Sequence, residues 1–70
     1  MQITINYGVE SATKTVAEGT TVGQIKKDYR PFFGWGDNLN AIVDGVVMPD
    51  ATVLSDGADV VMETAANTKG

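Results

Sequence analysis

Two apolar runs in the second half of the chain each end in an Asp-Gly pair, at Asp44-Gly45 and Asp56-Gly57. Asp-Gly is a strong signal for a tight turn, because both residues tolerate the left-handed backbone that such turns require. The two pairs follow an amphipathic segment in a chain of only 70 residues. This arrangement predicts one small domain in which a sheet packs on a helix.

Alternating polarity and β-branched residues indicate where the strands lie. The predicted strands are 1–7, 12–16, 39–43, 46–48 and 58–64. They make one domain over residues 1–64, and the small and polar residues 65–70 are expected to form a flexible tail. The inward-facing positions predict a core of Ile3, Ile5, Val16, Val22, Ile25, Tyr29, Val43, Leu54, Val60 and Met62.

A short helix is expected to begin at Val22. Thr21 and Gln24 have the spacing of a reciprocal cap, in which each side chain accepts a hydrogen bond from the other residue's backbone N–H. Pro31 should end the helix, since the residue before a proline is disfavoured in the helical conformation. Barely two turns remain, so the helix must be held by packing on the sheet.

Composition excludes several chemistries. The chain has no Cys and no His, which removes disulfides, thiolate or imidazole metal ligands and the usual Ser/His or Cys/His nucleophiles. Five basic against nine acidic residues give a net charge of −4, which works against binding to nucleic acid or to an anionic membrane. No apolar stretch approaches the roughly 18 residues of a membrane-spanning helix. We expect a cytoplasmic location by default and no cofactor. Enzymatic activity is not expected either, because a domain of this size rarely holds a catalytic cleft.

The predicted order of strand, strand, helix, strand, short strand, strand resembles that of ubiquitin. Three segments also resemble the small sulfur-carrier proteins of thiamine and molybdopterin synthesis: 19–22 before the helix, 40–45 at the first Asp-Gly turn, and 54–60 before the last strand. The resemblance implies an α+β fold of the β-grasp kind. It predicts a mixed sheet of four to five strands packed on one short helix.

Carriers of that family are activated at a C-terminal Gly-Gly, and here the chain departs from the pattern. Gly70 matches the last glycine, but Lys69 stands where the family has the first, and Ala58 stands where it has an acidic residue. A lysine side chain would obstruct the narrow channel that receives the glycines. We therefore predict that incubation with adenylating enzymes of the carrier family and ATP leaves the intact mass unchanged. A terminal thiocarboxylate that disappears on deletion of Gly70 would establish the carrier role instead.

The most aromatic segment of the chain is a candidate partner-binding site. Phe32, Phe33 and Trp35 lie beside two glycines, and large aromatics in such a loop can anchor a partner at low ordering cost. Alternatively, the rings turn inward and close one end of a small core. Of the three, Trp35 is expected to remain partly exposed.

A second candidate lies on the sheet. Ile42 points away from its buried neighbours, at a place where ubiquitin has a partner-binding patch, and with Val61 it can form an exposed apolar strip. Scattered apolar residues on a surface are also normal.

The charged residues have simpler interpretations. Lys26, Lys27 and Arg30 form a small basic edge that is typical of a solvated helix face. The aspartates have the spacing of turns and caps rather than of a calcium loop, so no metal site is predicted.

Two functional hypotheses remain. The first is a noncatalytic module that binds another protein, as a free adaptor or as a small subunit of a larger assembly such as a viral particle. The second is a diverged carrier activated at Gly70.

Overall fold

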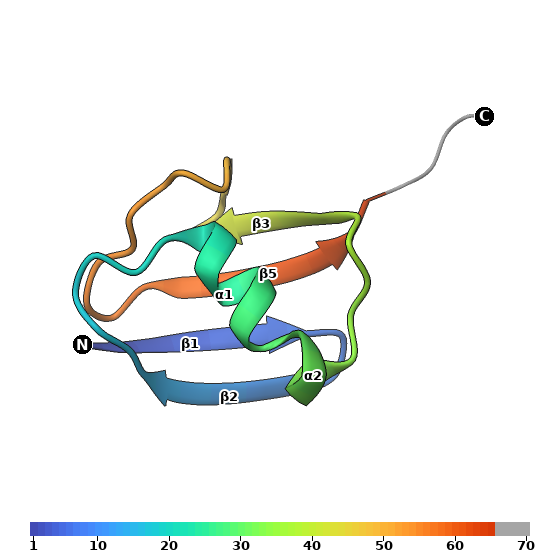
Figure 1. Ribbon diagram of the computed structural model, residues 1–70, viewed down its shortest axis with the longest axis horizontal. Coiled ribbons are helices and arrows are strands. Elements are labelled where there is room, and N and C mark those ends of the chain that lie inside the picture. The colour runs from blue at the N-terminus through green and yellow to red at the C-terminus, as the bar shows by residue number, and fades with distance from the viewer. Residues whose placement is uncertain (66–70) are drawn as a thin grey trace.

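The computed structural model describes residues 1–65, which form a five-stranded mixed sheet with two short helices on one face (Figure 1). The elements are β1 Gln2–Tyr7, β2 Glu10–Thr15, α1 Val22–Asp28, α2 Arg30–Phe33, β3 Leu39–Val43, β4 Val46–Met48 and β5 Asp59–Thr64. The strand order is β2-β1-β5-β3-β4, in which β1 and β5 are parallel and the other neighbours are antiparallel. The predicted α+β arrangement is confirmed. The predicted tail, apart from Ala65, lies outside the described residues, and so does Gly70.

The tight turn between β3 and β4 fixes how these two strands pair. Asp44 and Gly45 both have positive φ, 49° and 88°, as a two-residue hairpin turn requires. Val43 therefore faces Val46, and each following pair is set by the same register. The predicted hairpin is confirmed.

The start of α1 is confirmed in detail, but its end differs from the prediction. The Gln24 N–H donates to the Thr21 hydroxyl at 3.2 Å, and the Thr21 N–H donates to the Gln24 side chain at 3.0 Å. The helix ends at Asp28, before the proline is reached. Pro31 instead lies in the first turn of α2, where its missing N–H costs nothing and its fixed φ suits a helix. The prediction that Pro31 ends helical structure is wrong.

The loop between β4 and β5 holds α1 against the sheet. Its carbonyls accept hydrogen bonds from the first helical N–H groups, Val22 to Thr52 at 3.0 Å and Gly23 to Asp50 at 2.9 Å. A Cβ on Gly23 would lie only 3.2 Å from the Asp50 Cβ, so glycine permits this close approach. Packing and these backbone bonds together stabilise a helix that is too short to persist alone.

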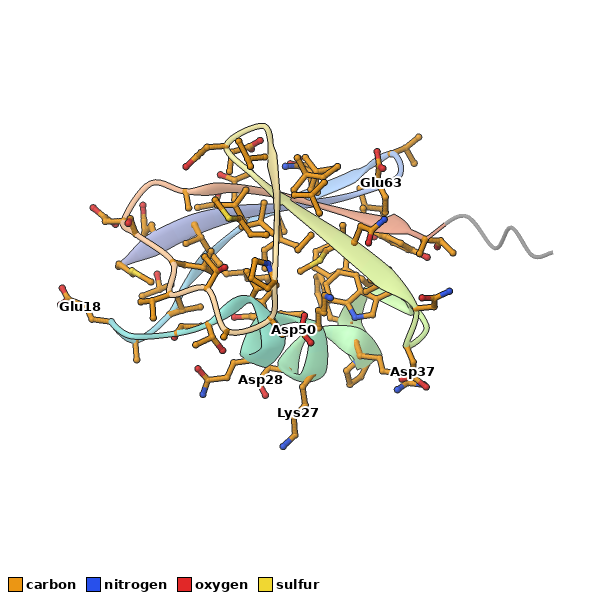
Figure 2. All side chains as sticks on the ribbon, turned by 90° about the horizontal axis from the view of Figure 1, so that it is seen from above. Glu18, Lys27, Asp28, Asp37, Asp50 and Glu63 are labelled. Atoms are coloured by element: carbon orange, nitrogen blue, oxygen red, sulfur yellow. The ribbon has the colours of Figure 1, made fainter. Side chains whose placement is uncertain are left out.

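The core lies between the helices and one face of the sheet. Eight of the ten predicted core residues are buried, whereas Val16 and Tyr29 are only partly buried and pack at its margin. The buried residues that the pattern missed are Phe33, Trp35, Leu39, Ala41 and Ala58. The other face of the sheet is not covered by any helix of residues 1–65 (Figure 2).

Candidate protein-interaction surface

Trp35 belongs to the core, and the expectation that it stays partly exposed is wrong. Only 2% of its surface is accessible, and its ring stacks on Phe33 with 5.0 Å between centroids and 5° between planes. Tyr7 of β1 meets it edge-on at 5.5 Å. The indole N–H donates to the Lys26 carbonyl of α1 at 2.8 Å, which satisfies its one polar group. The aromatic segment therefore closes one end of the core.

Phe32 is the only large exposed side chain of that segment, with 59% of its surface accessible. The Lys14 ammonium of β2 lies 4.1 Å from the centroid of its ring, a cation–π contact. The ring also meets buried Phe33 edge-on at 4.9 Å. Phe32 lies on α2 and so on the helix-bearing side of the sheet (Figure 1).

The uncovered face of the sheet carries a row of aliphatic side chains across three neighbouring strands. Ile42 of β3 lies opposite Val61 of β5 and opposite Val47 of β4. Ile42 and Val61 are half-buried, whereas 62% of Val47 is exposed. We call these three residues the aliphatic strip. Ile42 and Val61 lie next to each other, as the sequence predicted.

Val47 was not among the residues predicted for this surface, although the sequence contains a signal for it. The two-residue turn at Asp44-Gly45 requires Val47 to pair with Ile42, and paired residues point to the same face. The structure also divides the predicted set. Ile42 and Val61 lie on the uncovered face, Phe32 lies on the opposite side, and Phe33 and Trp35 are buried.

The strip leads into a shallow hollow where β1 and β5 end. The hollow has a volume of about 520 Å³. It is lined by Tyr7, Gly8, Val61, Met62, Glu63 and Thr64. Val61 thus belongs to both the strip and the hollow, whereas the Tyr7 ring packs against Phe33 and Trp35 in the core. A partner that covered the strip would meet this hollow at one end.

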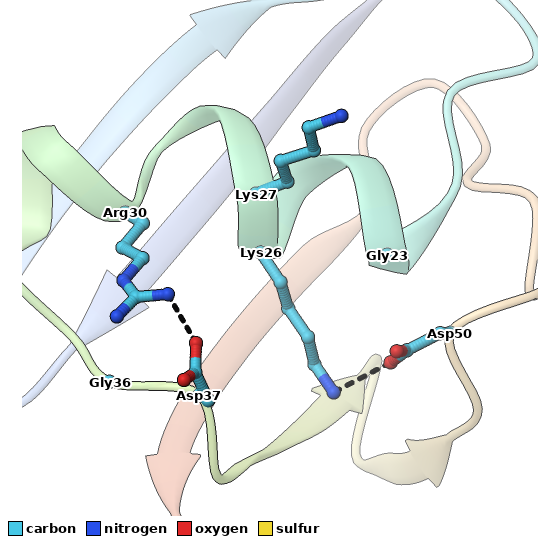
Figure 3. A pocket seen from close by; sticks show the side chains of 7 residues that line it. All are labelled: Gly23, Lys26, Lys27, Arg30, Gly36, Asp37 and Asp50. Atoms are coloured by element: carbon cyan, nitrogen blue, oxygen red, sulfur yellow. Dashed lines mark hydrogen bonds and ion pairs between the residues drawn. The ribbon is translucent and has the colours of Figure 1, made fainter.

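A second hollow, of about 290 Å³, lies beside the helices, and its basic side chains are largely neutralised (Figure 3). The Lys26 ammonium donates to the Asp50 carboxylate at 2.6 Å and to the Leu39 carbonyl at 3.0 Å. Arg30 forms an ion pair with Asp37. These contacts join α1 and α2 to the neighbouring loops. The Lys26 side chain, which is 20% exposed, therefore has a structural role. The Arg30 side chain is 52% exposed, so it stays on a largely solvated face as predicted.

Within residues 1–65, no three Asp or Glu side chains are arranged to hold a metal ion. No helix in the same range is long and apolar enough to cross a membrane.

Solved structures with the same arrangement identify the fold. The N-terminal ubiquitin-like domain in the 4931431F19Rik protein superposes with a TM-score of 0.79 at 18% identity, covering 100% of this chain and 79% of the other. Caldiarchaeum subterraneum ubiquitin gives 0.77 at 20% identity, covering 99% and 98%. The ubiquitin-like domain of Arabidopsis thaliana protein At2g32350 gives 0.77 at 12% identity, covering 100% and 82%. The fold is ubiquitin-like.

At these identities the likeness concerns the fold alone. No model of a protein family matches the chain, and no curated protein matches its sequence significantly. The resemblance to sulfur carriers stays a prediction from the turn motifs. The function of this ubiquitin-like domain must be argued from its surface.

Proposed function

We propose that this ubiquitin-like domain is a noncatalytic interaction module that docks another protein on the aliphatic strip. One observation carries the proposal: three adjacent strands place Val47, Ile42 and Val61 in a single row on a face that no helix of residues 1–65 covers. Most of the other outward positions on these and the neighbouring strands are polar, as at Asn6 and Asn40. Exposed apolar side chains that gather in one place on a polar surface are typical of binding sites.

The scaffold favours binding because it is already ordered. Side chains held on paired strands lose little conformational freedom when a partner arrives, so more of the contact energy remains as affinity. Full burial of a Val or Ile side chain contributes about 1.5–3 kcal/mol, and the half-buried members of the strip would contribute less than that. A few such residues at the centre of an interface can dominate its affinity.

As a free adaptor or as a small subunit of a larger assembly, the domain would use the strip in the same way. The carrier alternative depends on Gly70, which lies outside residues 1–65. Measurement of the intact mass tests that alternative independently of the strip.

The strip is tested with a double variant, Val47→Thr with Val61→Thr. Threonine keeps the shape and the strand preference of valine, so the fold should persist while an unsatisfied hydroxyl enters the interface. Proteins captured by the parent domain are identified and purified, whether or not the variant also captures them, and are titrated by calorimetry against both. We expect one-to-one binding to the parent and at least about a tenfold weaker affinity for the variant, equal to about 1.4 kcal/mol.

The matched control is Val53→Thr, the same chemical change at another exposed valine, which pairs with Thr21 outside the strip. This control should bind as the parent does. If the double variant melts at the parental temperature and binds every purified partner with unchanged affinity, the strip is not the docking surface.

A further inference from the structure

Among residues 1–65, the uncovered face of the sheet carries acidic side chains and no basic ones. Of the five basic residues, Lys69 lies outside residues 1–65. The other four lie away from the strip: Lys14 contacts Phe32, and Lys26, Lys27 and Arg30 lie on the two helices. Figure 2 shows Glu63 and Lys27 on opposite sides of the sheet.

Carboxylates lie close to the strip. Asp59 and Glu63 are two residues before and after Val61 on β5, so both point to the same face, about 7 Å away along the strand. Asp44, in the turn between β3 and β4, accepts a hydrogen bond from the Asp59 N–H at 3.1 Å. The two ion pairs within residues 1–65, Lys26–Asp50 and Arg30–Asp37, involve none of these three residues.

We propose that the partner of the strip is a segment whose aliphatic side chains are flanked by Lys or Arg. This inference rests on the proposed function and specifies the chemistry of the partner. Carboxylates at the rim of an apolar patch accelerate encounter with a basic segment and disfavour an acidic one. A second copy of this chain would place the carboxylates of both copies around one interface, in a protein of net charge −4. The charge therefore favours a basic partner over self-association.

The geometry of the strip suggests a suitable probe. Neighbouring strands are about 4.8 Å apart, so three side chains in a row span about 10 Å. Positions i and i+7 of a helix are about 10.5 Å apart along its axis, with i+3 or i+4 between them on the same face. An amphipathic helix laid across β4, β3 and β5 can therefore meet all three members of the strip.

The probes are three capped 18-residue peptides with leucines at i, i+4 and i+7 and with Lys, Gln or Glu at the flanking positions. Each is labelled and titrated with the full chain by fluorescence anisotropy at about 50 mM and 500 mM NaCl. We expect the lysine peptide to bind most tightly, the glutamate peptide most weakly, and the preference to shrink at high salt, where charges are screened.

Two charge variants locate the effect. Asp59→Asn with Glu63→Gln should weaken binding of the lysine peptide about three- to tenfold, because each exposed charge pair contributes only modestly to affinity. The same variant should leave the glutamine peptide unchanged. Asn at position 59 keeps an acceptor for the Asn6 amide, which now donates to Asp59 at 3.1 Å. The control, Glu18→Gln with Asp28→Asn, makes the same charge change on the helix-bearing side and should have no effect (Figure 2).

The outcomes separate this inference from the proposed function. If Val47→Thr with Val61→Thr weakens binding while the Asp59 and Glu63 variant does not, the strip is the interface and the inference about charge is wrong. If the valine variant has no effect, the proposed function fails even when charge matters. Equal affinity for the lysine and glutamate peptides, no binding of the lysine peptide at millimolar concentration, or a dimer in sedimentation experiments would each overturn the inference.

Discussion

Replacement of Trp35 by alanine is expected to lower the free energy of unfolding by about 3–5 kcal/mol, the usual cost of removing a large buried aromatic. The indole is 2% exposed, stacks on Phe33 and donates to the Lys26 carbonyl. Alanine would leave a cavity and an unpaired carbonyl at the end of α1. Because small domains have a total stability of only about 5–15 kcal/mol or less, much of the variant could be unfolded at 37 °C.

Urea denaturation measures this change, and Phe32→Ala is the matched control from the same segment. Phe32 is 59% exposed, so its loss should cost no more than about 1 kcal/mol through its contacts with Lys14 and Phe33. Equal losses for the two variants would show that the indole is not packed as described.

Leu54→Ala is expected to cost about 2–5 kcal/mol of stability. Leu54 is 4% exposed and lies in the loop that clamps α1, where its N–H donates to the Thr20 carbonyl at 2.9 Å. Because the backbone is held by these bonds, the cavity left by alanine cannot easily collapse. The measurement is again denaturation by urea, with the unfolding slope checked for a two-state transition.

Its neighbour supplies the control, since Val53 is 59% exposed and Val53→Ala should change stability by less than about 1 kcal/mol. A melting temperature for Leu54→Ala within a degree or two of the parent would show that Leu54 is not a core residue.

Local sequence signals predicted the features that depend on local chemistry. The Asp44-Gly45 turn follows from the tolerance of both residues for positive φ, and the cap at Thr21 and Gln24 follows from their spacing. The inward phase of β1 follows from strict alternation of polarity. That of β5 follows from the two-residue period of a strand, which puts Val60 and Met62 on one face and Val61 and Glu63 on the other. These signals need no knowledge of distant contacts.

Features that depend on tertiary contacts were missed for a common reason. A glycine-rich aromatic segment can face solvent or the core. Trp35 faces the core because the Tyr7 ring and the Lys26 carbonyl are placed there to contact it. Likewise a proline can end one helix or begin another. Here Pro31 is the second residue of α2, and the left-handed backbone of Gly34, with φ of 76°, ends that helix.

Part of the candidate site could be predicted as well. Alternation along β3 and β5 placed Ile42 and Val61 on the outer face, and the turn length would have added Val47. The helical half of the predicted set, represented by Phe32, lies on the other side of the sheet and cannot join the same flat interface. Composition gave the net charge of −4 but not its distribution, because that depends on which face each carboxylate occupies.

The most direct test of the docking surface is a map of amide chemical-shift changes in the ¹⁵N-labelled chain, titrated with a purified partner. If the strip is the docking surface, the largest changes occur at Ile42, Val47 and Val61 and at their neighbours on β3, β4 and β5. Amides of α1 and α2 should change least. Changes centred on Lys27 and Arg30, with the strip unaffected, would contradict the account and place the interface on the helices.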